Sequence, residues 1–378
     1  MHSVGLPPRT ICMAERNIQR SRLLAELLSG CWRPSPPESK TSAEEVAELM
    51  PLLLESGAAS LMWWQLRGCD WMDLQIAQEL QQAYRYSTIQ GDLHQHGIKQ
   101  VFTLLRSVGV EPVLVKGWAA ARLYPEAGLR PSGDIDLCVH PAQYDRAEAT
   151  LKDWKDHQFS VDLHKGFASL DRESAEVLYS RSQLVGLGDV SIRVLAPEDH
   201  LRVLCIHFLR HGAFRPLWLC DIAAAVEGRP SGFDWDLCLG RDRRRADWVG
   251  CTIGLAHQLL GASVDDTPVK RRSEGLPRWL IPTTLTQWEA PNTMEHGVMR
   301  HRAAMGRYLR NPSGLLKDLR NRWPNPIEAT VSVGGAFNDL PRLPFQVGDC
   351  IARSARFVRG LPRLMRDTRS AEPKEVSS

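Results

Sequence analysis

The stretch that decides the fold runs in three pieces: Val113-Leu-Val-Lys-Gly117, Ser132-Gly-Asp-Ile-Asp-Leu-Cys-Val139 and Ser160-Val-Asp-Leu-His164. Each piece contains a short apolar run that is typical of a buried β-strand. The second run carries Asp134 and Asp136 at alternate positions. Because side chains on a strand alternate between its two faces, both carboxylates are expected on one side. Two anions on one face repel each other, and a divalent cation between them would turn that repulsion into binding energy.

Around these pieces, strand and helix patterns alternate. The expected strands lie at 113–115, 135–139, 159–163 and 190–194, and the helices between them at 118–124 and 142–154. Strands that alternate with helices predict an α/β core of about 85 residues.

Helical patterns lie on both sides of this core. They are expected at 13–28, after a cap at Thr41 or Ser42, and at 58–66, 74–105, 201–208, 218–226 and 248–260, with a helix start at Pro197. We therefore predict four regions: an N-terminal helical region (1–110), the core (111–196), a C-terminal helical region (197–320) and a Pro-rich, basic tail (321–378).

Composition limits the classes of partner. The 378 residues carry a net charge of only +3, and no extended basic patch flanks the core, which argues against a nucleic-acid partner. Nine cysteines without a CxxC pair, no signal peptide and no membrane span predict a cytoplasmic protein. Segment 348–368 would place arginines on one side of a helix and apolar residues on the other. Such a helix could contact a membrane surface, but a solvated face or a contact with a partner is the favoured interpretation.

The central pieces offer the ligands that a nucleotide–metal site needs. Asp134, Asp136 and Asp162 together could hold one or two Mg²⁺ (or Mn²⁺) ions, which bridge nucleotide phosphates. Gly117 would let the backbone approach a phosphate closely, at the start of a helix whose N-terminus favours anions. Either Lys116 or Arg130 could add a positive charge to a triphosphate. For Lys116, a solvated strand end is an equally good interpretation.

Other polar residues have both functional and structural interpretations. His164 shares a strand face with Asp162, so it could bind metal or substrate or make a structural hydrogen bond. His207 and His211, one helical turn apart, fit a substrate pocket or the core better than a zinc site, because no matching ligand set accompanies them or His200. Asp221 lies on an apolar helix and needs a partner there, which suggests that it closes the site against the histidine helix.

These residues resemble the nucleotidyltransferase superfamily with the DNA polymerase β-type palm. The pattern h-h-h-Lys-Gly…Arg-x-x-Gly-Asp-h-Asp-h-x-Val…h-Asp-h-His carries the resemblance, where h is an apolar residue. More narrowly, the chain resembles the bacterial "uncharacterised nucleotidyltransferase" family, often found near genes for polysaccharides or peptide natural products. That family has a helical segment similar to 197–211, followed by a Trp-x-x-Asp-Ile-Ala pattern like 218–223. The resemblance covers residues 90–260.

The resemblance implies an α+β fold, in which a small mixed-sheet palm is flanked by helical regions. It implies that Asp134 and Asp136 form the metal-binding pair and that Asp162 completes the site and assists deprotonation of the acceptor. The residues that it assigns to nucleotide or phosphate binding are Lys116, Gly117, Arg130 and Gly133. Trp118 departs from the superfamily, which usually has Gly-Ser or Gly-Gly at this turn. The serine hydroxyl that often contacts the triphosphate in the superfamily is therefore missing here, and Lys116 is expected to make this contact.

The implied function is Mg²⁺-dependent transfer of a nucleotidyl or related phosphate-linked group. The donor would be a nucleoside triphosphate, and the acceptor a hydroxyl or phosphate on a small molecule, peptide or protein. The alternative is a catalytically inactive nucleotide-binding or antitoxin-like regulatory module, to which the Trp118 departure gives weight.

Overall fold

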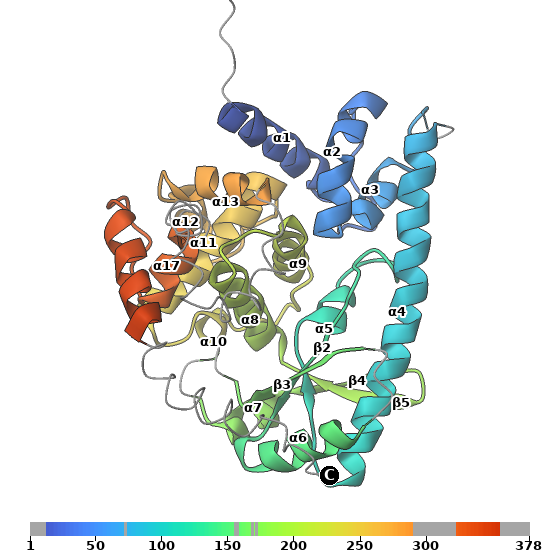
Figure 1. Ribbon diagram of the computed structural model, residues 1–378, viewed down its shortest axis with the longest axis vertical. Coiled ribbons are helices and arrows are strands. Elements are labelled where there is room, and N and C mark those ends of the chain that lie inside the picture. Colours follow the sequence, from blue (N-terminus) through green and yellow to red (C-terminus); the bar gives the residue numbers. More distant parts are fainter. Residues whose placement is uncertain are drawn as a thin grey trace, which may run out of the picture. The chain divides into compact units, whose positions relative to one another are not determined.

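The computed structural model describes residues 13–71, 74–154, 159–167, 170, 173–289 and 323–355. The chain divides into two compact units, Met1–Asn292 and Thr293–Ser378. The first unit contains a five-stranded mixed sheet with helices before and after it in the sequence (Figure 1). The fold is α+β, as predicted.

Short strands form the sheet in the order β3-β2-β1-β5-β4. They are β1 (Val113–Leu114), β2 (Ile135–Val139), β3 (Val161–Lys165), β4 (Gln183–Leu187) and β5 (Val190–Val194). β2 pairs in parallel with β3 and antiparallel with β1, while β1 and β5 are parallel. β4 and β5 form an antiparallel hairpin. The four predicted strands are confirmed, and β4 is an additional one.

One face of the sheet is covered by two helices from opposite sides of β2 in the sequence. These are the long helix α4 (Gln75–Ser107) and α6 (Tyr144–Asp153), which follows a short 3-10 turn η1 (Pro141–Gln143). Phe102 of α4 and Ala147 of α6 belong to the same buried apolar cluster as Leu137 of β2. Alternate residues of β2, starting at Ile135, therefore point toward this face.

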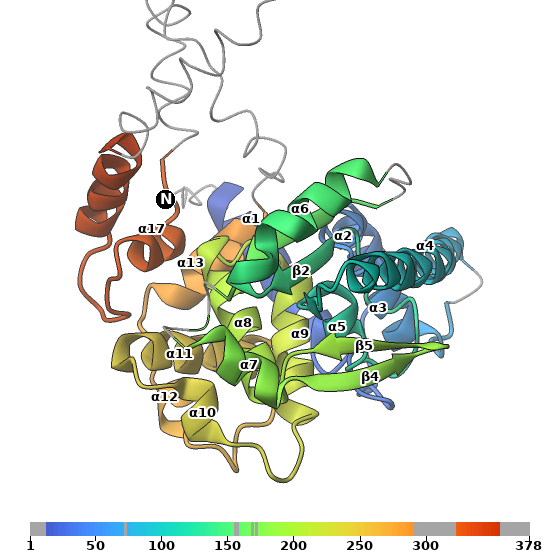
Figure 2. The same cartoon turned by 90° about the horizontal axis from the view of Figure 1, so that it is seen from below.

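The opposite face is packed by α7 (Ala175–Arg181) and α8 (Pro197–Arg210). Leu178 of α7 and Val203 of α8 share a second buried cluster with Val115 and Cys138. Figure 2 shows α6 and α7 on opposite sides of β2. Because Asp136 lies two residues before Cys138 on β2, its side chain belongs to the α7–α8 face.

The N-terminal helices are α1 (Met13–Leu28), α2 (Ala43–Ser56) and α3 (Ala59–Leu66), followed by α4. Of the two predicted caps, Ser42 begins α2: its hydroxyl accepts a hydrogen bond from the Glu45 amide, and the Glu45 carboxylate accepts one from the Ser42 amide. This reciprocal pair satisfies two amides that the first turn leaves free.

Apart from α7 and α8, the first unit contains six further helices from α5 onward among the described residues. They are α5 (Gly117–Ala121), α9 (Pro216–Glu227), α10 (Trp235–Leu239), α11 (Arg243–Leu260), α12 (Lys270–Glu274) and α13 (Leu280–Trp288). α8 begins at Pro197, as predicted, because a proline at the first helical position forfeits no hydrogen bond. α8 packs against α9, α10 and α11, while α1 packs against α11 and α13.

The second unit is described for residues 323–355. It contains α17 (Pro326–Ser332) and a helical segment at 343–355. The predicted basic helix at 348–368 is helical as far as 355, and its remainder lies outside the described residues. In the part of the chain that the structure describes, no helix is both long and apolar enough to cross a membrane.

Candidate active site

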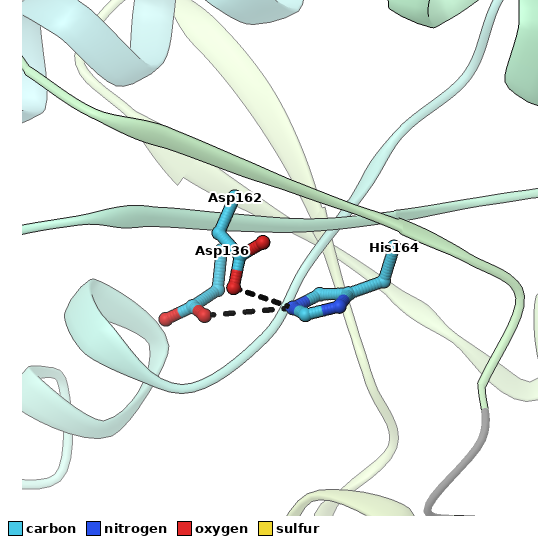
Figure 3. Close-up of side chains that lie close together, drawn as sticks. All are labelled: Asp136, Asp162 and His164. Atoms are coloured by element: carbon cyan, nitrogen blue, oxygen red, sulfur yellow. Dashed lines mark ion pairs between the residues drawn. The ribbon is translucent and has the colours of Figure 1, made fainter. Parts of the chain in front are cut away.

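The pairing of β2 with β3 brings two of the predicted acids together. Asp136 lies opposite Asp162 in the parallel register, and His164 follows two residues later on the same face of β3. The Nε2 atom of His164 lies 3.2 Å from Asp162 Oδ2 and 3.7 Å from Asp136 Oδ1 (Figure 3). One ligand atom from each side chain lies within 4.8 Å of the others. Among the described residues, this is the cluster whose geometry could hold a metal ion.

The donor set of this cluster fits a divalent cation. Two carboxylates supply hard oxygen ligands of the kind that Mg²⁺ and Mn²⁺ prefer, and the imidazole adds a nitrogen. The Asp136 side chain is only 14% exposed, whereas those of His164 and Asp162 are 40% and 57% exposed. The cluster therefore has one sheltered ligand and an open side through which a nucleotide could enter.

Lys116 contacts the sheltered member of the cluster. Its ammonium nitrogen lies 2.6 Å from Asp136 Oδ1, and the Lys116 side chain is only 16% exposed. Burial alone would raise the pKa of the Asp136 carboxyl, but its hydrogen bond with His164 and the charge of Lys116 outweigh burial and lower that pKa. Asp136 is therefore ionised at neutral pH. Neither a solvated strand end nor a free phosphate ligand describes Lys116 as it lies in the structure.

The backbone at Lys116 is unusual. Lys116 has φ 57° and ψ −147°, and Gly117 after it has φ 39°. Conformations of this kind are common only for glycine and cost on the order of 1–3 kcal/mol for other residues. Together, the two residues turn the chain from β1 directly into α5 and aim the Lys116 side chain at Asp136.

Asp134 lies just before β2 and is exposed. It is not part of the cluster of Asp136, Asp162 and His164. Its carbonyl oxygen accepts a hydrogen bond of 3.1 Å from His94 Nε2, which fixes the backbone at the entry to β2. The role of its carboxylate as a metal ligand, like that of the exposed Gly133 beside it in phosphate binding, stays a prediction.

Arg130 and Asp221 form a buried ion pair across 91 residues of sequence. Arg130 donates from Nε and Nη2 to the Asp221 carboxylate, the shortest contact being 2.8 Å, and from Nη1 to Ser132 Oγ. The hydroxyl of Tyr124 donates to the same carboxylate at 2.9 Å. Asp221 thus has the partner that its position on an apolar helix requires. Phosphate binding by Arg130 stays a prediction, because its donors are committed to protein acceptors in the described structure.

His207 and His211 form an aromatic cluster with Trp218 of α9. The ring centroids of the two histidines are 4.4 Å apart, and that of Trp218 lies 4.4 Å from His207 and 5.4 Å from His211. Burial and the charge of Lys116 lower the pKa of both imidazoles, while Asp136 has the opposite effect on His211. Lys116 is therefore within electrostatic reach of both rings, and Asp136 within reach of His211.

The sequence did not reveal two features of this site. The Lys116–Asp136 ion pair depends on the positive φ of Lys116, and no sequence pattern predicts that backbone conformation. Pairing of Arg130 with Asp221 joins distant residues, and the only available signal was the need of a buried acid for a cation.

Known proteins share similarity with this chain at the level of a family model and of a solved structure. The family model described as "Uncharacterised nucleotidyltransferase" matches residues 42–261, more than half of the chain. No curated protein matches. A crystal structure of an antigenic nucleotidyltransferase-like protein from Paracoccidioides brasiliensis is similar over 47% of this chain and 96% of that chain, with 12% identity and a TM-score of 0.34. The matching family model spans the sheet, the cluster around Asp136 and helices α8 and α9. Because it covers more than half of the chain, this chain belongs to the family of uncharacterised nucleotidyltransferases.

Proposed function

We propose that the chain transfers a nucleotidyl or related phosphate-linked group from a nucleoside triphosphate to an acceptor, with Mg²⁺ or Mn²⁺ as cofactor. The observation that carries the proposal is the register pair of Asp136 and Asp162, with His164 beside both and Lys116 on Asp136. A site with two carboxylates, a lysine and a strained turn before a helix suits the binding of a cation and phosphates.

In this proposal, each residue has a distinct task. Asp136, Asp162 and His164 hold the cation. Asp134, which is exposed just before β2, supplies a further carboxylate. When bound, such a cation neutralises charge that develops on the phosphate oxygens. The ammonium group of Lys116 leaves Asp136 and binds the triphosphate.

Proton transfer belongs to the most exposed acid of the cluster. The Asp162 side chain is 57% exposed, so an acceptor hydroxyl can reach it. Its carboxylate then accepts the proton of that hydroxyl as the oxygen attacks the α-phosphorus, and the bond from this phosphorus to the α–β bridging oxygen breaks, so that pyrophosphate leaves. The acceptor is a small molecule, a peptide or a protein.

A binding module without catalysis is the second candidate. Trp118 stands at the turn where the superfamily usually has a small or hydroxyl-bearing residue, and it packs against the apolar cluster under the sheet. A chain that binds nucleotide without releasing pyrophosphate would support this candidate.

The test measures pyrophosphate release from labelled nucleoside triphosphates in the presence of cell extract as a source of acceptors. We expect Asp136→Asn to lower release by about 100-fold or more, because removal of the sheltered ligand weakens the cation site. Asp145→Asn removes the charge of a 94% exposed acid and should leave release unchanged. Unchanged release in an Asp136→Asn, Asp162→Asn double variant would rule the proposed function out.

A further inference from the structure

A stripe of side chains on α8 runs along the sheet face that carries Asp136. Val203, His207 and His211 are spaced four residues apart and therefore lie on one side of the helix. Val203 is buried against Val115 and Cys138. Val115 directly precedes Lys116, and Cys138 lies two residues from Asp136 on the same face of β2. The next two members of the stripe, His207 and His211, therefore extend along the face beside the metal cluster.

The two imidazoles of this stripe are supported from behind by Trp218. Trp218 is buried and contacts both rings, and Phe214 packs edge-on against it with centroids 5.1 Å apart. His207 is partly exposed and His211 is exposed. We call His207, His211 and Trp218 the aromatic platform. Its accessible part consists of imidazole rings, and the indole forms its base.

The ring nitrogens of the platform are free for a ligand. Elsewhere in the described chain, ring nitrogens of His94, His140 and His257 are engaged by a carbonyl or a carboxylate. By contrast, no side-chain hydrogen bond joins His207 or His211 to another described residue. The lowered pKa of both imidazoles favours their neutral form at pH 7, in which each ring presents one donor and one acceptor.

A chain of contacts holds the aromatic platform in place relative to the Lys116-Gly117 turn. Trp218 lies one helical turn before Asp221 on α9, and Asp221 is bound to Arg130. Arg130 in turn donates to Ser132, which lies beside Gly117. The turn between α8 and α9 is fixed at Ala213, which has φ 61° and whose carbonyl oxygen accepts a hydrogen bond from Trp288. A rigid aromatic surface of this kind loses little entropy when a flat ligand stacks on it.

We propose that the aromatic platform binds the base of the donor nucleotide, while its phosphates lie at the Lys116-Gly117 turn. A neutral imidazole stacks well on the face of a base, and the second imidazole, tilted by 52° from the first, can direct its ring nitrogens to the donors and acceptors on the edge of that base. The nearby positive charge of Lys116 suits the phosphates. This inference rests on the proposed function, because it assigns the part of the same substrate that the metal cluster does not contact.

Calorimetric titration of the full chain separates recognition of the base from recognition of phosphate. The probes are the four ribonucleoside triphosphates and inorganic tripolyphosphate, each with Mg²⁺. We expect the native chain to bind at least one nucleotide more tightly than tripolyphosphate. His211→Ala should weaken nucleotide binding about tenfold through loss of stacking, and leave tripolyphosphate binding unchanged. His211→Phe keeps a ring and should retain most of the nucleotide affinity.

His140→Ala is the matched control, because His140 is partly exposed and lies at the far end of β2, where it pairs with Glu176. It should affect neither probe. Because His211 is exposed, its substitution should not impair folding, and an unchanged melting temperature checks this.

Two kinds of result would overturn the inference. If His211→Ala weakens binding of both probes equally, or of neither, the platform does not recognise the base. The same conclusion follows if the native chain binds tripolyphosphate as tightly as every nucleotide, although the proposed transfer could still hold. If nucleotide binding depends on His211 but no pyrophosphate is released, the inference stands and the proposed function fails.

Discussion

At the scale of single residues, Lys116 is the position where local strain and site chemistry meet. Its left-handed backbone conformation is unfavourable, yet it places a cation 2.6 Å from Asp136 at a position that is largely shielded from water. An isolated buried carboxylate is costly, and the ammonium group removes that cost. Lys116 therefore competes with a divalent cation for the same carboxylate.

Lys116→Gln should strengthen binding of Mn²⁺ in the absence of nucleotide. Removal of the ammonium group frees Asp136 and eliminates repulsion of the incoming cation, so the dissociation constant should fall about tenfold, which corresponds to about 1.4 kcal/mol. Electron paramagnetic resonance of free Mn²⁺ measures the change. Lys165→Gln is the matched control, since Lys165 is an exposed residue of β3 that pairs only loosely with Asp145. Unchanged or weaker Mn²⁺ binding by Lys116→Gln would contradict this competition.

At the scale of elements, the sequence predicted the strands that carry the site because their apolar alternation is strong. β2 occupies 135–139, as expected, and β3 lies two residues later than expected. β4 was missed because its residues are mostly exposed and Gly186 interrupts the apolar run. The two-residue Gly188-Asp189 turn between β4 and β5 was the available signal for this hairpin.

The order of the strands and the pairing of distant residues could not be predicted from the sequence. Alternation predicted which residues share a face of one strand, so Asp162 and His164 were placed together correctly. It did not predict that Asp136 would lie opposite Asp162, because register between strands depends on packing of the whole sheet. For the same reason, the ion pair of Arg130 with Asp221 was not foreseen.

α8 carries a buried histidine whose titration should make stability depend on pH. Burial lowers the pKa of His200 to about 4; the Asp221 carboxylate opposes the shift, and the charges of Arg122 and Arg130 add to it. Below pH 6.5, His200 is protonated in the unfolded chain but stays neutral in the folded chain. The free energy of unfolding therefore falls as the pH falls toward 4. From pH 7 to pH 5, the native chain should lose about 2 kcal/mol of unfolding free energy more than His200→Asn does.

Urea unfolding of both proteins at the two pH values measures this difference. Other titrating groups, including His94 and His207, are present in both proteins, so their contributions cancel in the comparison. Equal losses in the two proteins would show that His200 does not contribute to the pH dependence.

At the scale of the whole molecule, the first unit is closed by contacts between its beginning and its end. Ser21 donates to the carbonyl of Leu285, and Ser29 to that of Leu260. Trp32 and Arg33, just after α1, both donate to the carboxylate of Glu227 at the end of α9. The predicted N-terminal and C-terminal helical regions thus share an interface, and Glu227 in it lies at the opposite end of α9 from Trp218.

Glu227 joins several parts of this interface. Its carboxylate accepts hydrogen bonds from Trp32 Nε1, from Arg33 and from the amide of Ser263. Burial alone would raise the pKa of Glu227, but its bonds to Arg33, Ser263 and Trp32 lower it. Glu227→Ala should therefore reduce the free energy of unfolding by about 2 kcal/mol, because it leaves several donors without an acceptor.

Urea unfolding of the full chain measures this loss, and Glu148→Ala on the exposed side of α6 should shift the midpoint little. The same substitution distinguishes two roles for α1. If α1 only adds stability, the nucleotide affinity of Glu227→Ala stays unchanged under conditions in which the variant is fully folded. If α1 also holds α9 in position, the variant binds nucleotide more weakly while its tripolyphosphate affinity is retained, because Trp218 lies on the same helix as Glu227. We expect the first result, since the ion pair of Asp221 with Arg130 anchors α9 independently, close to Trp218.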